Sequence, residues 1–438
     1  MARSLAAGVS GREVWAWAMY DFANSGYTTV VITAIFNAYF VAVVAGNQPW
    51  GTFAWTAALA LSYALIMLMA PLVGAYADLH AAKKKLLLIS TVGCVVFTAA
   101  LALVGPGQIW LAIPLIALSN FFYGSGENLI AAFLPELARG RALGKVSGWG
   151  WSLGYLGGLV SLGACLVYVD WAEAHGRQAA DFVPVIMLIT AALFALASLP
   201  TFLFLKERAI PQTHARHHLV REAYTRLGQT LHHAARYRDL RRFLVCTLFY
   251  QAGIQAVISL AAIYAQQAMH FSTRDTILLI FVVNITAAIG AFAFGYLQDR
   301  IGHIQTIALT LVLWIVMVLL AWGAQGPPMF WLAANLAGIA MGASQSAGRA
   351  LVGLLSPAKR RAEFFGLWGL AVKFSSILGP ITYGLASWLS RGDHRLAILV
   401  TGSYFVVGLM LLGGVDVLRG RRAALRSQRD STLTLREA

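Results

Sequence analysis

Four ionisable side chains lie inside long apolar stretches of this sequence: Asp21, Glu127, Arg349 and Lys373. A charge at the centre of a bilayer costs about 2.5–3.5 kcal/mol on insertion scales, so it requires a partner, a water-filled cavity or a function. Lys373 lies close to two serines and too deep in its stretch to reach a headgroup easily. It predicts a counter-charge, either for an anionic group of a small solute or for a protein carboxylate, and both alternatives stay open.

Asp21 precedes Asn24 by about one helical turn, so the two residues share a helix face. Partial burial of a carboxyl group favours its protonated form, which would suit a proton carrier. The alternative is an ionised hydrogen-bond anchor near the membrane surface. We treat Asp21 and Glu127 as candidate proton-coupling residues.

Uncharged polar side chains also recur in the apolar stretches. Any one of them is more often a helix–helix hydrogen bond than a ligand contact, but as a set they predict a cavity with a polar lining. Asn37 and Asn335 have this character. The candidate solute-binding residues are Lys373, Asn24, Tyr27, Asn120, Asn128, Gln251, Gln255 and Gln345.

The composition places these residues in a membrane protein. Hydrophobic residues make up 59% of the 438 residues and charged residues only 12%, against about a quarter in a soluble domain. The net charge of +15 is spread over short loops, which favours anionic lipid headgroups over nucleic acid as a partner. The cysteines share no metal or redox spacing, and nucleotide-binding and zinc-protease motifs are missing. We therefore expect no metal, no cofactor and no enzyme activity.

Apolar stretches that cross a bilayer must be helices, because lipid offers no partner for unpaired backbone groups. About 20 helical residues cross the hydrocarbon core. We predict an all-α integral membrane protein with 12 transmembrane helices in two pseudo-symmetric six-helix bundles. The predicted spans are 14–45, 54–77, 86–105, 109–133, 147–169, 183–205, 243–266, 276–298, 304–323, 329–354, 364–389 and 396–418.

Lys and Arg concentrate in the hydrophilic interruption between the two sets of spans, in both termini and in loops on the same side. The positive-inside rule then predicts cytoplasmic termini next to an anionic inner leaflet. Leu219, Leu227 and Leu231 recur at helical spacing, which predicts an amphipathic surface helix, with a loosely ordered linker as the alternative. The predicted parts are an N-terminal bundle (1–205), a connector (206–242), a C-terminal bundle (243–418) and a basic tail (419–438).

An internal repeat supports two related halves. Gly74 and Asp78 recur as Gly295 and Asp299, a shift of 221 positions (295 minus 74). A shift of about half the chain length indicates a duplicated six-helix unit.

Glu127 and Arg349 are separated by 222 positions (349 minus 127), so they are mates in this repeat. Mates that face a pseudo-twofold axis lie at the same depth in the membrane. Opposite charges there predict a gate pair that closes the cytoplasmic side and parts when the cavity opens inward. The alternative is that each residue pairs within its own half.

A lysine cluster follows Gly74 and Asp78, and Arg300 follows Gly295 and Asp299. This pattern resembles the loop signature of the major facilitator superfamily. The resemblance implies that these five residues are conformational latches, in which the aspartate engages the start of a neighbouring helix, rather than solute contacts.

The segments 15–25, 250–253 and 363–368 are similar to the vacuolar-effluxer-like branch of that superfamily, the autophagy-type amino-acid effluxers. One difference is Ala252, where the branch commonly has an acid. The resemblance implies a secondary transporter that works by alternating access and exports a small polar or amphipathic solute, such as an amino acid or a derivative, with proton coupling. The alternatives are a lipid, lysolipid or hydrophobic-drug exporter, an intramembrane enzyme and a receptor. We expect a monomer in a bacterial inner membrane.

Overall fold

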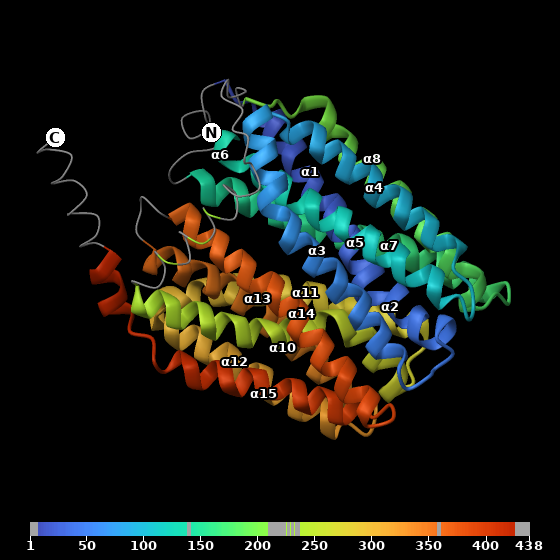
Figure 1. Ribbon diagram of the computed structural model, residues 1–438. Coiled ribbons are helices and arrows are strands. Elements are labelled where there is room, and N and C mark those ends of the chain that lie inside the picture. The colour runs from blue at the N-terminus through green and yellow to red at the C-terminus, as the bar shows by residue number, and fades with distance from the viewer. Residues whose placement is uncertain are drawn as a thin grey trace, which may run out of the picture. The chain divides into compact units, whose positions relative to one another are not determined.

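The computed structural model describes residues 8–137, 142–208, 225, 228, 232, 237–356 and 361–424 (Figure 1). Within these residues every regular element is helical. A helix pairs its backbone groups within one segment, as a lipid environment requires. The chain forms two compact units, one of Met1–Ala223 with Ser259–Phe281 and one of Tyr224–Ile258 with Val282–Ala438.

In the first unit, helices cover each predicted span of the N-terminal half. α1 packs against α7 and α8, whereas α5 packs against α3 and α4. The helices are α1 (Gly11–Tyr27), α2 (Phe36–Tyr39), α3 (Gly51–His80), α4 (Lys83–Ala100), α5 (Ile109–Ala131), α6 (Leu134–Leu137), α7 (Ala142–Ala174) and α8 (Ala179–Phe204).

The first predicted span is not one regular helix. π-Helical segments lie at Thr28–Ala34, before α2, and at Phe40–Val44, after it. An unbroken run of β-branched residues at 28–33 lowers the local helix propensity, because these side chains lose χ1 freedom against the preceding turn. At Ile35 the backbone leaves the helical region, with φ −120° and ψ −61°. π-Helical turns are frequent at functional sites, and hydropathy predicts the length of this span but not its turns.

The second unit contains the remaining helices. Two of them run through both units, because 259–281 belongs to the first unit. The helices are α10 (Arg238–Met269), α11 (Thr273–Ile301), α12 (His303–Gly323), α13 (Pro327–Leu355), α14 (Arg361–Leu389) and α15 (His394–Leu412).

Eleven spans in the described part of the chain are long and apolar enough to cross a membrane. The predicted span 329–354 corresponds to α13, which has 29 residues but is not among these eleven. Glycines, amides and serines in α13, such as Asn335, Ser344 and Gln345, lower its hydropathy. Length and hydropathy in the described part of the chain therefore support eleven of the twelve predicted spans.

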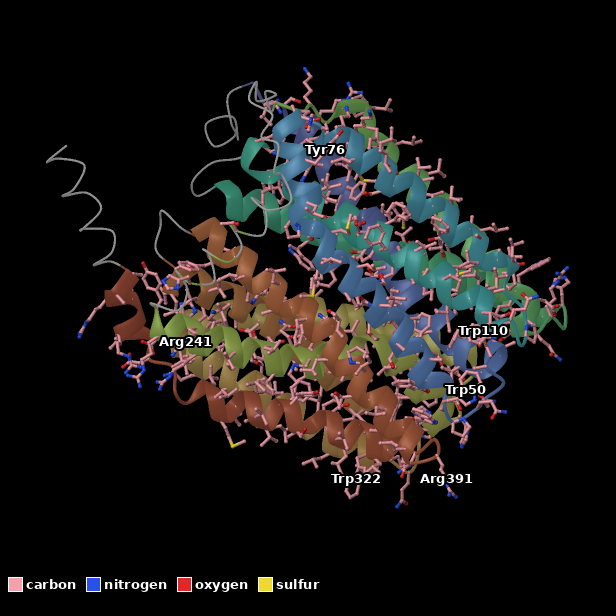
Figure 2. The ribbon with its side chains drawn as sticks, viewed as in Figure 1. Trp50, Tyr76, Trp110, Arg241, Trp322 and Arg391 are labelled. Atoms are coloured by element: carbon pink, nitrogen blue, oxygen red, sulfur yellow. The ribbon has the colours of Figure 1, made fainter. Side chains whose placement is uncertain are left out.

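Large apolar side chains cover the outside of the helices. Leu389 is 74% exposed and Phe292 is 70% exposed, which in water would mark an interaction surface and in lipid is the expected solvent contact. Trp110 lies at the start of α5 and Trp322 near the end of α12, both exposed (Figure 2). Tryptophan prefers the membrane–water interface, so the place of each residue near a helix end fits a membrane-spanning helix.

Candidate functional site

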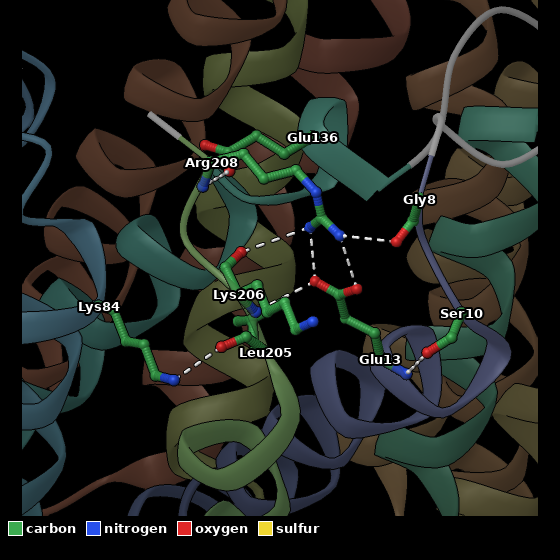
Figure 3. A network of polar contacts seen from close by, with 8 residues as sticks. All are labelled: Gly8, Ser10, Glu13, Lys84, Glu136, Leu205, Lys206 and Arg208. Atoms are coloured by element: carbon green, nitrogen blue, oxygen red, sulfur yellow. Dashed lines mark hydrogen bonds and ion pairs between the residues drawn. The ribbon is translucent and has the colours of Figure 1, made fainter. Parts of the chain in front are cut away.

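An ion pair ties the start of α1 to the segment that follows α8. The Arg208 guanidinium donates to both Glu13 oxygens, at 2.5 Å from Nη1 and 2.8 Å from Nη2, and the Lys206 backbone N–H donates to the same carboxylate at 3.1 Å (Figure 3). Glu13 is only 3% exposed. The hydrogen bonds that Arg208 donates to the Glu13 carboxylate raise the pKa of Arg208. Bidentate pairs of this kind are strong and fix the geometry of both partners.

Neighbouring carboxylates extend this contact to α4 and α6. Glu207 accepts hydrogen bonds from the backbone N–H groups of Lys83 (2.6 Å) and Lys84 (3.1 Å), at the start of α4. A carboxylate at a helix N-terminus satisfies unpaired donors and complements the helix dipole. Glu136, on α6, pairs with Lys83 Nζ at 3.0 Å and accepts from the Arg208 backbone N–H at 3.1 Å. Much of the basic cluster after α3 is therefore engaged within the protein.

The second unit has a matching contact. Asp239, in the first turn of α10, accepts from Arg419 Nε at 2.8 Å and from Arg419 Nη2 at 2.5 Å. The Asp416 backbone N–H donates to the same carboxylate at 3.0 Å. Asp239 is 3% exposed, and its carboxylate raises the pKa of Arg419. In each unit, a buried acid near the start of the first long helix thus binds an arginine that follows the last long helix. We call the two pairs, Glu13–Arg208 and Asp239–Arg419, the end clamps.

The sequence analysis did not find the end clamps. Glu13 and Arg208 are separated by 195 positions, and Asp239 and Arg419 by 180. The available signal was their placement: an acid at the start of the first predicted span of each half and an arginine shortly after the last.

A tyrosine lies over a glycine at a matching place in both units. A Cβ atom added to Gly126 on α5 would lie 2.5 Å from the Tyr20 hydroxyl, and one added to Gly348 on α13 would lie 2.5 Å from the Tyr250 hydroxyl. The glycines differ by 222 positions (348 minus 126), which is the predicted repeat shift.

A glycine also meets the backbone of the first long helix in both units. A Cβ on Gly157 of α7 would lie 2.2 Å from the Phe22 carbonyl oxygen, and one on Gly379 of α14 would lie 1.8 Å from that of Ala252. Only glycine permits this approach. Gly157 and Gly379 again differ by 222 positions (379 minus 157), so three kinds of contact, including the end clamps, recur in the two units.

Tyr27 lies in a hydrogen-bonded interior of the first unit. Its hydroxyl accepts from Ser119 Oγ at 3.0 Å, and Ser119 and Thr98 hydroxyls are 2.9 Å apart. The Tyr20 hydroxyl is 2.8 Å from that of Thr91, on α4. These hydrogen bonds connect α1, α4 and α5, as is usual for polar residues that hold helices together. The solute-binding role of Tyr27 stays a prediction.

Asn24 is buried on the same helix with an unpaired amide. It is 6% exposed, yet neither its side-chain oxygen nor its side-chain nitrogen has a hydrogen-bond partner. Asn120 is fully buried, donates to Ser62 Oγ at 3.0 Å and leaves its oxygen unpaired. An unpaired buried amide costs about 1–3 kcal/mol, so such groups are natural positions for bound water or a polar solute.

Asp21 and Glu127 are both half-buried. Asp21 faces α7, where a Cβ on Gly150 would collide with its carboxylate oxygen. Asn128 is exposed and lines a pocket of about 170 Å³ between α3 and α5, together with Gly74 and other residues of these helices. The pocket is smaller than sites for drug-sized ligands.

In the second unit the structure brings two candidate residues together. The Gln251 amide on α10 donates to the Gln345 carbonyl oxygen on α13 at 3.1 Å. Gln251 is fully buried, and its own oxygen has no partner. Gln255 and Lys373 are half-buried on α10 and α14.

Other predicted site residues have side chains outside the described part of the structure. Arg300 is exposed near the end of α11. Because the undescribed side chains include those needed for the latches and the Glu127 gate pair, both stay predictions, as does the connector helix. Among the described residues, no group of three or more His, Cys, Asp or Glu is placed to hold a metal ion. Among the predicted site residues, Asp78, Gly295, Asp299 and Arg349 are those that the structure does not describe beyond their place in a helix.

Residues 51–425 match the family described as vacuole effluxer Atg22 like. The uncharacterized MFS-type transporter YxiO of Bacillus subtilis is 26% identical over 407 residues, which cover 91% of this chain and 94% of that protein. The crystal structure of the nucleoside transporter NupG has a TM-score of 0.69 at 15% identity, covering 93% of this chain and 99% of that one. The D-xylose–proton symporter has a TM-score of 0.67 at 16% identity, covering 93% and 98%. At these identities the two crystal structures show the fold alone, that of MFS transporters.

Proposed function

The chain belongs to the Atg22-like vacuole effluxer family of MFS-type transporters, and from this premise we propose that it is a secondary active transporter with twelve membrane-spanning helices. It works by alternating access between two related six-helix bundles, at 1–205 and 243–418. The bundles are joined by a basic cytoplasmic connector and followed by a cytoplasmic tail. The protein acts as a monomer in a bacterial inner membrane, with its basic loops next to anionic lipids.

The repetition of contacts is the observation that carries this proposal. Tyr20 over Gly126 corresponds to Tyr250 over Gly348, and the Phe22 carbonyl against Gly157 corresponds to that of Ala252 against Gly379. The end clamps recur as well. A fixed catalytic site or a receptor has no need for two bodies with the same internal contacts, whereas a carrier that rocks about a central site does.

The proposed cargo is a small polar or amphipathic solute such as an amino acid or a derivative, moved outward. Gln251 and Gln345 support a polar site, because the buried Gln251 oxygen remains available to a donor on the solute. Lys373 provides a positive charge for an anionic group of the solute. Asn24, Asn120, Asn128, Gln255 and Tyr27 are the further polar candidates for this site.

Proton coupling is assigned to Asp21 and Glu127. Both carboxyl groups are half-buried in a helical unit, a setting in which protonation and solute binding can be coupled. Glu127 with Arg349 forms the cytoplasmic gate, and Gly74, Asp78, Gly295, Asp299 and Arg300 form the latches.

Counterflow in liposomes tests the proposal. Purified protein in liposomes loaded with unlabelled amino acid should accumulate labelled amino acid, and a proton gradient should drive net movement. Gln251→Leu should reduce the rate at least tenfold, because it removes a buried acceptor, whereas Gln305→Leu, the same change at an exposed position near the start of α12, should leave it within about twofold. Chemical conversion of the solute would indicate an enzyme, binding without flux a receptor, and flux of lysolipid alone a lipid exporter.

A further inference from the structure

Three polar contacts near the ends of long helices join segments that are far apart in the sequence. All three lie in the first compact unit, at the ends of the helices opposite to the end clamps. The Asn37 side chain donates to the Ser259 carbonyl oxygen at 3.1 Å, and the Gln267 amide donates to the Asn47 side-chain oxygen at 2.7 Å. Arg274 Nε donates to an Asp170 carboxylate oxygen at 2.6 Å.

The partners in these contacts come from different predicted bundles. Asn37, Asn47 and Asp170 belong to the N-terminal one, whereas Ser259, Gln267 and Arg274 belong to the ends of α10 and α11. These ends, 259–281, pack in the first compact unit, although the rest of both helices lies in the second. A carrier that opens on this side must separate the three pairs.

Asn37 is suited to such a change because it has a second partner. It is fully buried between the two π-helical segments and also donates to the Thr33 carbonyl oxygen at 3.0 Å. Its own oxygen accepts from the Ala38 backbone N–H at 2.8 Å. When Ser259 withdraws, the Asn37 amide keeps these local bonds, so it is not left without a partner, and only the hydrogen bond to Ser259 is lost.

The other two contacts contribute little stability because both lie at the protein surface. The Arg274 and Asp170 side chains are 49% and 45% exposed, and exposed ion pairs contribute little because water and salt screen them. Contacts of this kind favour the closed conformation without preventing it from opening.

We propose that Asn37–Ser259, Asn47–Gln267 and Asp170–Arg274 form the outer gate of this carrier, with Asn37 as its buried positioning residue. The inference rests on the proposed transport function and assigns residues to a gate on the side opposite to the Glu127–Arg349 pair. The gate holds the outer side closed and opens when the ends of α10 and α11 move away from α2, from the turn at Asn47 and from the end of α7.

Labelling of a cysteine at position 259 tests the outer gate without knowledge of the solute. Ser259 is 2% exposed and bonds to Asn37 through its backbone, so Ser259→Cys keeps the contact. In a background with the buried Cys94, Cys165 and Cys246 changed to alanine, a membrane-impermeant maleimide applied from outside reports opening. Arg274→Glu and Asp170→Lys should each speed labelling about two- to fivefold, the factor that corresponds to an exposed ion pair. Combining Asp170→Lys with Arg274→Glu should return the rate to its starting value.

Asn37→Leu should speed labelling about tenfold, since a buried hydrogen bond is worth more than an exposed pair. Arg391→Glu is the matched control, because it reverses an equal exposed charge in the loop between α14 and α15, and it should leave the rate unchanged. The proposal is overturned if the reversals and Asn37→Leu leave the labelling rate unchanged, or if the double reversal fails to restore it. Labelling requires no transport assay, so a wrong solute or coupling ion leaves this test intact.

Discussion

The contacts at the two ends of the helices differ in burial and in geometry. At the starts of α1 and α10, Glu13 and Asp239 are each 3% exposed and each accepts two hydrogen bonds from one arginine, with a backbone N–H as a third donor. At the other end, Arg274 and Asp170 meet through one hydrogen bond and are about half exposed. The first arrangement fixes the elements it joins, whereas the second permits them to part.

This difference teaches where movement is permitted in the carrier. The end clamps join helices within one unit, so they hold the first and last long helices of each bundle together throughout the cycle. The outer gate joins segments from different predicted bundles, so it must break once in each cycle. Rigid bundles with weak contacts between them are the requirement for alternating access.

Removal of the Glu13 carboxylate should have the largest effect on stability. Glu13→Ala leaves the Arg208 guanidinium and the Lys206 N–H without their acceptor, and loss of one partner of a buried pair is strongly destabilising. The apparent Tm of the purified protein in detergent should fall by roughly 5–10 °C. Glu173→Ala removes an exposed carboxylate at the other end of the helices and serves as the control. Equal shifts for the two variants would contradict the difference between the ends.

A methyl group between the packed helices should have the next largest effect. Gly379→Ala and Gly157→Ala each place a Cβ against a backbone oxygen, so the helices must separate, at a cost of about 1–3 kcal/mol. Gly163→Ala, where a Cβ meets nothing within 4 Å, is the control. Thermal unfolding should show similar losses for the two mates in the repeat. A loss at only one of them would argue against equivalent packing in the two units.

The second end clamp should be weaker than the first. Arg419 is half exposed, whereas Arg208 is 27% exposed, so water can replace more of the bonds that Asp239→Asn removes. The apparent Tm should fall by about 2–4 °C. A larger fall than that of Glu13→Ala would reverse the ranking, and Asp416→Asn provides a variant that keeps the ion pair.

The outer ion pair should contribute least to stability. Asp170→Asn should leave the apparent Tm within about 1 °C of the unmodified protein, because both partners are exposed. The same variant should nevertheless speed labelling at position 259. A variant that lowers the Tm as much as Asp239→Asn would place Asp170 among the structural contacts rather than in a gate.

The sequence predicts the parts of this structure that depend on hydropathy and on the repeat. Each predicted span corresponds to one helix, except the first, which is a series of helical segments. The shift of 222 positions, inferred from Glu127 and Arg349, recurs between Gly126 and Gly348, each of which meets a tyrosine. Both follow from properties that act along the chain: the solvation of backbone groups in lipid and the duplication of a six-helix unit.

Contacts between distant residues were beyond that reasoning. The end clamps depend on which side chains meet after the helices pack, and the π-helical turns of the first span depend on local crowding among β-branched residues. Of the polar candidates, Gln251 and Gln345 meet, whereas Tyr27 lies in the interior of the first unit. Helical spacing gives the face of one helix, but not the neighbour that covers it.

The most direct test measures distances between spin labels at the two ends of the helices. One pair of labels at Ala174 and His270 reports the outer gate, and another at Gly11 and Lys206 reports an end clamp; all four positions are exposed. Double electron–electron resonance in nanodiscs would compare the protein with its Arg274→Glu variant. For the variant, the account predicts a second, longer distance between the labels at Ala174 and His270, the outer pair. The distance between the labels at Gly11 and Lys206, the inner pair, should stay single and unchanged. An outer distance that stays single, or an inner distance that changes with it, would contradict the account.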